Sequence, residues 1–372
     1  MRLTRCLLAL SVLGATGFAR PTAAPGQTGV DEWRPHTAPL YGVSYSPDIG
    51  LLIGAGVVHT RYEFRALPPS TRLVAQAAYA TGASSYRVSL EGEFRRPLAP
   101  KTLAVELYAS GLEILRFHGL GNATGASQPE SVYRVRQEQF LFSPSVSVPL
   151  APRLRLTAGP VVKYVRTHPD SGTLLLISGP HYGTGDFRAA GARAFLELDT
   201  RDNPLAAARG VHLVVAAHWY PAAWDVVRPF GGLLAEGATY LSAGDPPQAT
   251  VALRAGLAAM GGTVPFHELV YLGGGTTIRG YPEQRFAGRS GAYANAELRM
   301  RVVWLEAADV GVLGLADAGR VWGEADASRR WHTAAGGGLW FAWQHRRANT
   351  VSIAWARGAE RAALYVRVGF MF

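Results

Sequence analysis

Cysteine is nearly missing from this chain: Cys6 is the one cysteine in its 372 residues. Arg2 and Arg5 precede an apolar segment that runs from 6 to 18, and small residues follow up to Ala24. This pattern predicts a secretory signal peptide at residues 1–24, which export would remove. A lipoprotein attachment cysteine would follow the apolar segment, so lipidation is not expected. The mature chain then has no thiol, which excludes disulfides, thiolate metal sites and a cysteine nucleophile.

Long apolar segments and a high density of charge are missing as well. After the N-terminus no uninterrupted run of about 18 to 20 apolar residues occurs, so membrane-spanning helices are not expected. Charged residues make up 17% of the chain and hydrophobic residues 48%, and the mean hydropathy is +0.06. A mean hydropathy near zero fits a β-barrel, whose lipid-facing and lumen-facing residues average out along each strand.

Signatures of catalysis are also missing. His267-Glu268 lacks the second histidine of a zinc-binding helix, and no Gly-x-Ser-x-Gly nucleophile turn occurs. The run Gly273–Gly275 is not followed by the Lys-Ser/Thr of a phosphate-binding loop. We therefore predict that the protein is not an enzyme and binds neither a cofactor nor a metal.

The chain has instead a strict two-residue alternation. Between 292 and 301 every second residue is polar and the residues between them are small or apolar. The polar positions are Tyr293, Asn295, Glu297, Arg299 and Arg301. A period of two indicates a β-strand with one wet and one apolar face. Charged residues on the wet face suggest a strand between a polar lumen and lipid.

Similar segments recur along the chain and predict an all-β fold, a transmembrane antiparallel β-barrel of about 16 strands. The predicted strands are 39–46, 50–63, 71–82, 84–95, 101–113, 131–149, 153–167, 187–200, 210–220, 229–242, 249–260, 291–304, 309–319, 333–343, 349–357 and 362–372. Short proline-containing links at 97–100 and 149–152 are expected at the periplasmic end. Longer polar stretches at 118–130, 168–186, 262–290 and 322–332 are expected outside.

The predicted organisation is a signal peptide at 1–24, a short periplasmic linker at 25–38 and an outer-membrane barrel at 39–372. A propeller would show a repeat of about 40 to 50 residues, and none is present. A soluble sandwich would have to bury arginine at many alternating positions, which is costly.

The net charge of +10 would on its own suggest nucleic acid as a partner. The basic residues, however, stand at strand spacing rather than in tracts, as at Arg153, Arg155 and Arg193. We interpret them as lumen and rim residues that face water or lipopolysaccharide phosphates. Outer-membrane lipids and lipopolysaccharide are therefore the expected partners, and nucleic acid is not.

The last predicted strand must pair with the first, because open strand edges are not tolerated in lipid. Its residues Leu364, Val366, Val368, Phe370 and Phe372 are predicted to share one apolar face. Tyr365 and the two phenylalanines resemble the C-terminal signal by which barrels are recognised for insertion. The alternative is a hydrophobic last strand with no such role.

Three segments resemble the BamA/TamA-type outer-membrane proteins, the bacterial surface antigen superfamily. Residues 198–210 are similar to the family's Asp-x-Arg-Asp-x-Pro…Gly turn between strands eight and nine. Residues 272–281 are similar to the (Val/Ile)-Arg-Gly-(Tyr/Phe) motif of the loop between strands eleven and twelve. Residues 314–322 are similar to the Phe-x-Asp-x-Gly element of strand thirteen, with Leu315 in place of the usual phenylalanine.

The resemblance implies that the glycine-rich loop folds back into the lumen. There Arg279, within Arg279-Gly280-Tyr281, would pair with Asp317 and lie near Glu297. Such a pair is physically reasonable, because an unpaired buried guanidinium is costly and a carboxylate matches its fork. The alternative is a surface turn with a solvated arginine.

The resemblance also implies a function in outer-membrane protein insertion, or in polypeptide or lipid translocation, through local opening of the seam between the first and last strands. The predicted linker is too short for even one of the periplasmic POTRA modules of such proteins. We therefore expect a barrel-only member that works with a separate periplasmic partner or substrate polypeptide, or that has another task. The alternative is a passive, porin-like diffusion channel.

Overall fold

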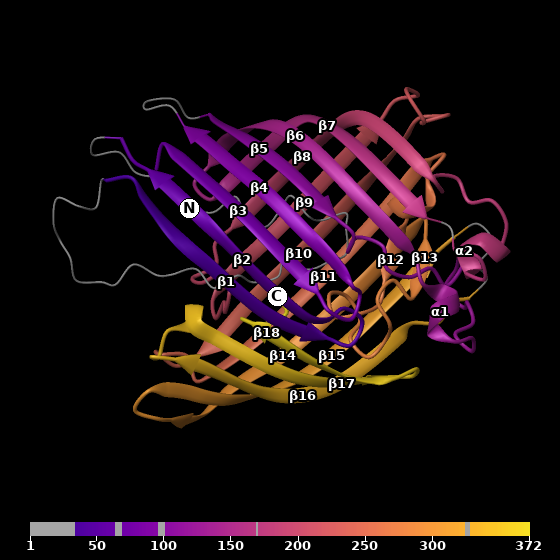
Figure 1. Cartoon of the computed structure of the whole chain (residues 1–372). Helices are drawn as coiled ribbons and strands as arrows, with labels where there is room; N and C mark the ends of the chain where they lie inside the picture. Colours follow the sequence, from indigo (N-terminus) through magenta and orange to yellow (C-terminus); the bar gives the residue numbers. More distant parts are fainter. Residues whose placement is uncertain (1–33, 64–68, 96–100, 169, 324–327) are drawn as a thin grey trace.

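The computed structural model describes residues 34–63, 69–95, 101–168, 170–323 and 328–372. The predicted signal peptide and the predicted link at 97–100 lie outside these residues. Sixteen described strands close into an antiparallel barrel (Figure 1), which confirms the predicted fold class. The strands are β1 (His36–Ser46), β2 (Gly50–Arg61), β3 (Thr71–Ala80), β4 (Ser85–Arg95), β5 (Thr102–Ser110), β6 (Arg136–Ala151), β7 (Leu154–His168), β8 (Asp186–Asp199), β9 (Gly210–Tyr220), β10 (Phe230–Ala243), β11 (Ala249–Gly262), β14 (Ser290–Trp304), β15 (Ala308–Trp322), β16 (His332–Trp343), β17 (Thr350–Gly358) and β18 (Ala362–Val368).

Most strand bounds agree with the predicted ones to within a few residues, and three differ for identifiable reasons. β1 begins at His36, inside the segment expected to be a linker. The strand expected from 131 begins only at Arg136, because Glu130–Tyr133 form the short helix α1 directly after Pro129. β18 ends at Val368, because Gly369 takes a φ of 82° and breaks the extended backbone.

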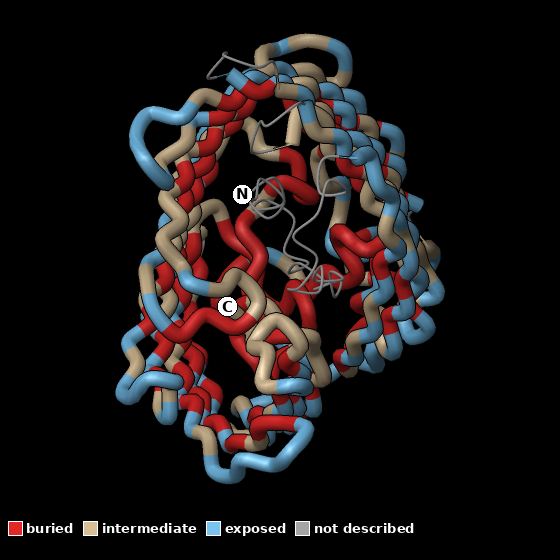
Figure 2. Tube along the Cα trace, turned by 90° about the vertical axis from the view of Figure 1, so that its left-hand side faces the viewer, coloured by how far each residue is buried: buried red, intermediate tan, exposed pale blue. Residues whose placement is uncertain are grey.

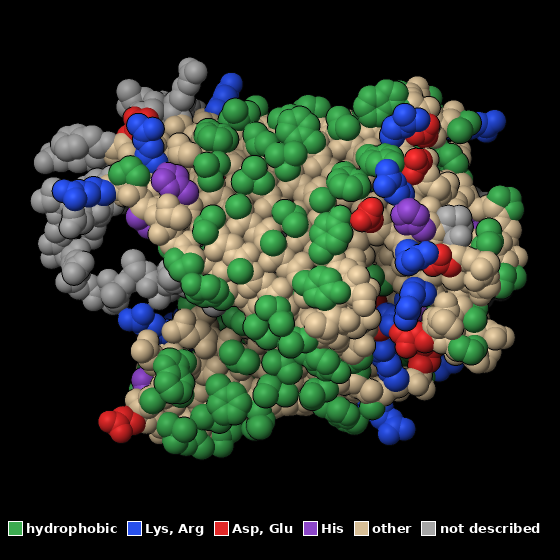
Figure 3. Space-filling view, viewed as in Figure 1, with side chains coloured by type: hydrophobic (Ala, Val, Ile, Leu, Met, Phe, Trp, Pro, Cys, Tyr) green, Lys and Arg blue, Asp and Glu red, His purple; other side chains and the backbone are tan. Residues whose placement is uncertain are grey.

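Side chains of the barrel wall point alternately to the outside and to the lumen, as the sequence predicts. On β14 the side chains of Leu298 and Met300 are 45% and 43% exposed on the outside, whereas Asn295, Glu297 and Arg299 are buried inside. Figure 3 shows hydrophobic side chains over the outside of the barrel and charged ones gathered toward one end. This is the distribution of a barrel that crosses lipid.

The two ends of the barrel differ in the length of their connections. Short links such as 244–248 and 305–307 lie at one end, and long ones such as 111–135 and 263–289 lie at the other. The helices α1 and α2 (Leu174–Ile177) belong to the long connections (Figure 1). By the usual rule for outer-membrane barrels, the long-connection end is the outer end and the other is the inner, periplasmic end. Among the described residues no helix combines the length and apolar character needed to span a membrane.

The predicted lumen and rim arginines lie in three different surroundings. Arg193 is buried inside and its Nη2 donates to Glu106 Oε2 at 2.6 Å. Arg155 donates to the Ser147 hydroxyl from the inner half of β7. Arg153 lies in the β6–β7 turn at the inner end, with a φ of 71°.

The long connection between β11 and β14 folds into the lumen, and we call residues 263–289 the plug loop. It contains the 3-10 turn η2 (Phe266–Glu268) and a small hairpin of β12 (Val270–Leu272) and β13 (Phe286–Gly288). Figure 2, viewed from the inner end, shows buried chain inside the ring of strands. Apolar residues of the plug loop pack with Phe117 and Val135 of the 111–135 connection, which lies over it.

The first and last strands pair, as predicted, but the seam between them is short. β1 and β18 share one paired position, Tyr45↔Val366. On its other side β1 pairs with β2 along all 11 of its residues.

Candidate functional site in the barrel lumen

Arg279 of the plug loop is clasped by two acidic side chains of the barrel wall. Its Nε and Nη2 donate to the two carboxylate oxygens of Asp317 on β15, at 2.7 and 2.8 Å. Its Nη1 donates to Glu297 Oε1 on β14 at 2.6 Å. Burial alone would lower the pKa of Arg279, but Glu297 and Asp317 raise it above the ordinary value, so the guanidinium is always charged. The structure thus places together the three residues that the family resemblance paired.

Neighbouring groups fix the geometry of this clasp. Asn295 donates to Asp317 Oδ1 at 2.8 Å and also to the Thr277 carbonyl of the plug loop at 2.7 Å. Glu297 accepts two further hydrogen bonds from Arg299, at 2.9 and 2.7 Å. Every charge of the cluster therefore has an opposite partner, which a buried ion-pair network requires.

Gly280 and Tyr281 attach the same part of the plug loop to the last strands. Gly280 has a φ of 79°, and a Cβ there would lie 2.3 Å from the backbone nitrogen of Gly358. A side chain is therefore excluded at this position. The Gly280 N–H donates to the hydroxyl of Tyr365 on β18 at 3.0 Å. Tyr281 is buried, and its hydroxyl donates to the Thr333 carbonyl at 3.3 Å.

A second ion pair anchors the plug loop to the far wall. Glu268 in η2 accepts a hydrogen bond from Lys163 on β7, and both residues are buried. β7 lies seven places from β18 in the order of the sixteen strands, nearly opposite it. The plug loop is therefore attached to both sides of the lumen and crosses it.

Further contacts tie the plug loop to the outer connections. Arg285 donates to both carboxylate oxygens of Glu360 in the β17–β18 turn, at 2.9 and 2.7 Å. Gln284 accepts from the Leu115 N–H at 3.1 Å and donates to the Glu113 carbonyl at 3.2 Å. The outer side of the lumen is thus covered by two interlocked connections.

The chain end turns into the inner mouth of the lumen after Gly369. The prediction that Phe370 and Phe372 share one apolar face with Leu364 is therefore wrong, because Leu364 is exposed on the outside of the barrel. The guanidinium of Arg299 lies 3.9 Å from the ring centroid of Phe370 and donates to the Phe372 carbonyl at 2.9 Å. Their role as a barrel recognition signal, together with Tyr365, stays a prediction.

The 198–210 turn lies beside this chain end. Asp199 binds Arg201 through both oxygens, and Asp202 accepts from the Ala208 N–H at 3.0 Å. The Leu205 carbonyl accepts from the Phe370 N–H at 3.1 Å. Side chains of the turn therefore stabilise its own shape, and its backbone also binds the chain end.

One group of metal-binding residue types has suitable geometry among the described residues, namely Glu197, Asp199 and His212. Its members are already engaged, because Arg201 binds Asp199 and His212 bonds Glu197 at 3.1 Å. No cofactor site follows from this group, and the expected absence of a metal stays a prediction.

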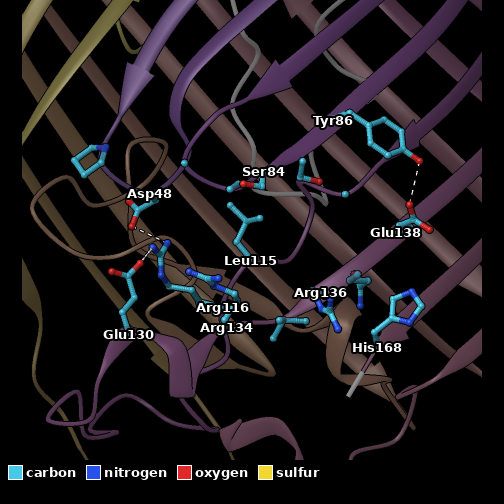
Figure 4. A pocket seen from close by; sticks show the side chains of 17 residues that line it. Asp48, Ser84, Tyr86, Leu115, Arg116, Glu130, Arg134, Arg136, Glu138 and His168 are labelled. Atoms are coloured by element: carbon cyan, nitrogen blue, oxygen red, sulfur yellow. Dashed lines mark hydrogen bonds and ion pairs between the residues drawn. The ribbon is translucent and has the colours of Figure 1, made fainter. Parts of the chain in front are cut away.

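A cavity of about 710 Å³ opens at the outer end beside the β1–β2 turn (Figure 4). Its wall includes Asp48, Arg116 and Glu130, which form a chain of ion pairs, and Tyr86, which donates to Glu138 at 3.1 Å. The charges of opposite sign are balanced around it, so the cavity does not select an ion of one sign.

The sequence reading missed the Lys163–Glu268 pair and the role of Arg299. Lys163 is one of only two lysines in the chain and directly follows the apolar residues Pro160, Val161 and Val162, which is a usable signal. Its partner lies 105 positions away and could not be chosen from spacing.

The model described as the Omp85 superfamily domain matches residues 74–353. A search of curated proteins finds no match. Among solved structures the chain is similar to BamA from Haemophilus ducreyi lacking POTRA domains 1–3, with 15% identity and a TM-score of 0.64. That similarity covers 98% of this chain and 78% of that one.

CdiB is a second similar structure. For CdiB from Acinetobacter baumannii the identity is 13% and the TM-score 0.55, and the match covers 90% of this chain and 59% of that one. For CdiB from Escherichia coli the identity is 13% and the TM-score 0.59, and the match covers 92% of this chain and 64% of that one. The chain thus spans less than two thirds of either CdiB chain. At these identities the likeness shows the fold.

Proposed function

This chain belongs to the Omp85 superfamily, and we propose that it inserts proteins into the outer membrane, or passes polypeptide or lipid, through the β1–β18 seam. The family's barrel fold implies an outer-membrane location, and the proposal includes export by the predicted signal peptide at 1–24. The observation that carries the proposal is the seam itself, which has one paired position, Tyr45↔Val366.

A short seam matters because backbone hydrogen bonds hold a barrel closed in lipid. Each neighbouring strand pair of the wall shares many more backbone positions than β1 and β18 do. Separation at this seam therefore breaks fewer bonds than separation elsewhere. In the described part of the chain, residues 36–44 of β1 have no partner on the β18 side. Such a free strand edge can pair with an incoming extended segment.

A passive diffusion channel is the second candidate, and the polar lumen favours it. The plug loop argues against it, because ion pairs join this loop to β7 on one side and to β14 and β15 on the other. A channel for steady diffusion has no need of a strap across its lumen. We therefore rank the seam function first.

A disulfide across the seam tests the proposal. Tyr45 and Val366 lie directly opposite, and such residues have Cα atoms about 4.5 to 5.5 Å apart, within disulfide range. The Tyr45→Cys/Val366→Cys protein would be reconstituted in liposomes, with Val43→Cys/Ile53→Cys within the β1–β2 pair as the matched control. The readouts are insertion of a small unfolded barrel protein and transfer of a fluorescent phospholipid.

Oxidation of the seam pair should stop both activities and reduction should restore them, while the control pair should have no effect. Equal activity of the oxidised and reduced seam pair would contradict the proposal. A large, steady conductance that oxidation does not change would favour the diffusion channel.

A further inference from the structure

The outer end of the seam is joined by side chains in addition to the backbone. Asp48 lies in the turn directly after β1, and Arg361 directly precedes β18. Arg361 Nη1 donates to Asp48 Oδ1 at 2.9 Å, and its Nη2 donates to Asp48 Oδ2. The two edge strands are therefore bridged by a bidentate ion pair, the strongest form of contact between these side chains.

This ion pair is well shielded from water. The side chain of Asp48 is 0% exposed and that of Arg361 is 24% exposed. Removing one partner of a buried pair is expensive, because the other charge is left without compensation. An exposed pair of the same type contributes far less. The pair is thus able to hold two strands that share one backbone position.

Asp48 and Arg361 also connect the seam to other parts of the outer end. Asp48 Oδ1 lies 2.7 Å from Arg116 Nη1, and Arg116 also pairs with Glu130 of α1. Arg361 Nη2 donates to the Tyr281 carbonyl of the plug loop at 2.9 Å. One carboxylate and one guanidinium therefore join the β1–β2 turn, the 111–135 connection, β18 and the plug loop.

The inner part of the seam has no comparable contact among the described residues. The Tyr45↔Val366 pair lies one residue from the outer end of β1, and residues 36–44 extend from it toward the inner end. Resistance to opening is therefore concentrated at the outer end. The cavity of about 710 Å³ borders Pro47 and Asp48 and leaves the tip of the β1–β2 turn room to move once the ion pair is broken (Figure 4).

We propose that the Asp48–Arg361 ion pair is a latch that keeps the outer end of the seam closed and connected to the plug loop, so that the seam opens from its inner end. This inference rests on the proposed opening of the seam, but it does not depend on which cargo uses it. Asp48 and Arg361 act as positioning residues for the two edge strands and for Tyr281.

The rate of disulfide formation between Tyr45→Cys and Val366→Cys in reconstituted protein tests the latch. Asp48→Asn and Arg361→Gln would each be combined with this cysteine pair. The matched control is Asp170→Asn, which breaks the exposed Arg136–Asp170 pair at the same outer end. A heat-dependent shift on gels checks that each barrel is folded.

Each latch variant should slow disulfide formation by at least about tenfold, whereas Asp170→Asn should leave the rate unchanged. The double variant Asp48→Asn/Arg361→Gln should be slowed by less than the product of the two single effects, because both changes remove the same Asp48–Arg361 pair, although each also removes one contact of its own, with Arg116 or with Tyr281. An unchanged rate in folded Arg361→Gln, or full additivity in the double variant, would overturn the latch.

The two proposals fail in distinguishable ways. If the latch variants slow disulfide formation but the wild type moves no cargo, the latch is supported and the proposed function is contradicted. If oxidation of the seam blocks cargo movement while the latch variants form the disulfide at the wild-type rate, only the latch is contradicted.

Discussion

Replacing Arg279 by alanine should release the plug loop from the wall. The guanidinium makes three charged hydrogen bonds of 2.6 to 2.8 Å to Asp317 and Glu297. At about 1.5 to 3 kcal/mol for each, their simple sum would be about 4.5 to 9 kcal/mol. The sum overstates the effect, because Asn295 still binds Asp317 and Arg299 still binds Glu297 in the variant. A loss near the lower limit for breaking a buried pair, about 3 kcal/mol, is therefore expected.

This loss can be measured as a change in how often the lumen opens. About 3 kcal/mol corresponds to roughly a hundredfold shift in an equilibrium, so brief openings of single barrels in planar bilayers should become about a hundred times more frequent. The opening frequency of Arg279→Lys should lie between those of the wild type and Arg279→Ala, because lysine keeps the charge and loses the planar guanidinium fork. The control is Arg329→Ala, which removes an exposed arginine near the outer end. An unchanged conductance together with an unchanged gel shift would refute the argument.

Three further predictions concern other parts of the plug loop. Glu268→Gln should destabilise the folded barrel by about 3 kcal/mol, because it leaves Lys163 buried without a charged partner. Glu268→Gln/Lys163→Met should recover much of that loss, and equal thermal unfolding temperatures of the two variants would contradict this. Gly280→Val should unseat the loop, since a Cβ would lie 2.3 Å from a backbone nitrogen, and limited proteolysis of the loop should rise; wild-type protection would contradict it. Burial, and next the nearby charge of Asp48, raise the pKa of Glu283 to about 8, so the plug loop should be most stable below pH ~4.5 and lose stability as the pH rises to about 8. Brief openings of single barrels in planar bilayers should therefore become more frequent over that pH range, and the same pH dependence in Glu283→Gln would contradict a role of Glu283.

The strand pattern was predictable because each wall residue of a transmembrane barrel faces either lipid or the lumen. On β14 this requirement places Leu298 and Met300 on the lipid side and Glu297 and Arg299 on the lumen side. Strand ends were less predictable, because they depend on backbone angles that alternation does not encode. Gly369 reads as one more residue of an alternating strand, yet its φ of 82° ends β18 and turns Phe370 into the lumen.

The lumen site was predictable only where the resemblance supplied the pairing. The Arg279–Asp317 contact spans 38 positions, and no periodicity points from one residue to the other. The Asp48–Arg361 pair spans 313 positions and becomes visible only once barrel closure brings the two chain ends together. Because many arginines and acidic residues stand at inward positions, alternation selects the candidates but cannot match them.

The contacts of β18 connect the plug loop with the seam. β18 pairs with β1 at one position, but Tyr365 accepts from the Gly280 N–H and Arg367 donates to the Gly275 carbonyl. The side chains of this strand are therefore bound to the plug loop at two places. If β18 moves away from β1, these bonds must either break or carry the plug loop with them. Arg279 holds the plug loop on β14 and β15, so release of the plug loop and opening of the seam share part of one free-energy cost. Weakening the contacts of the plug loop should therefore make the seam easier to open, and weakening the seam should make the plug loop easier to release.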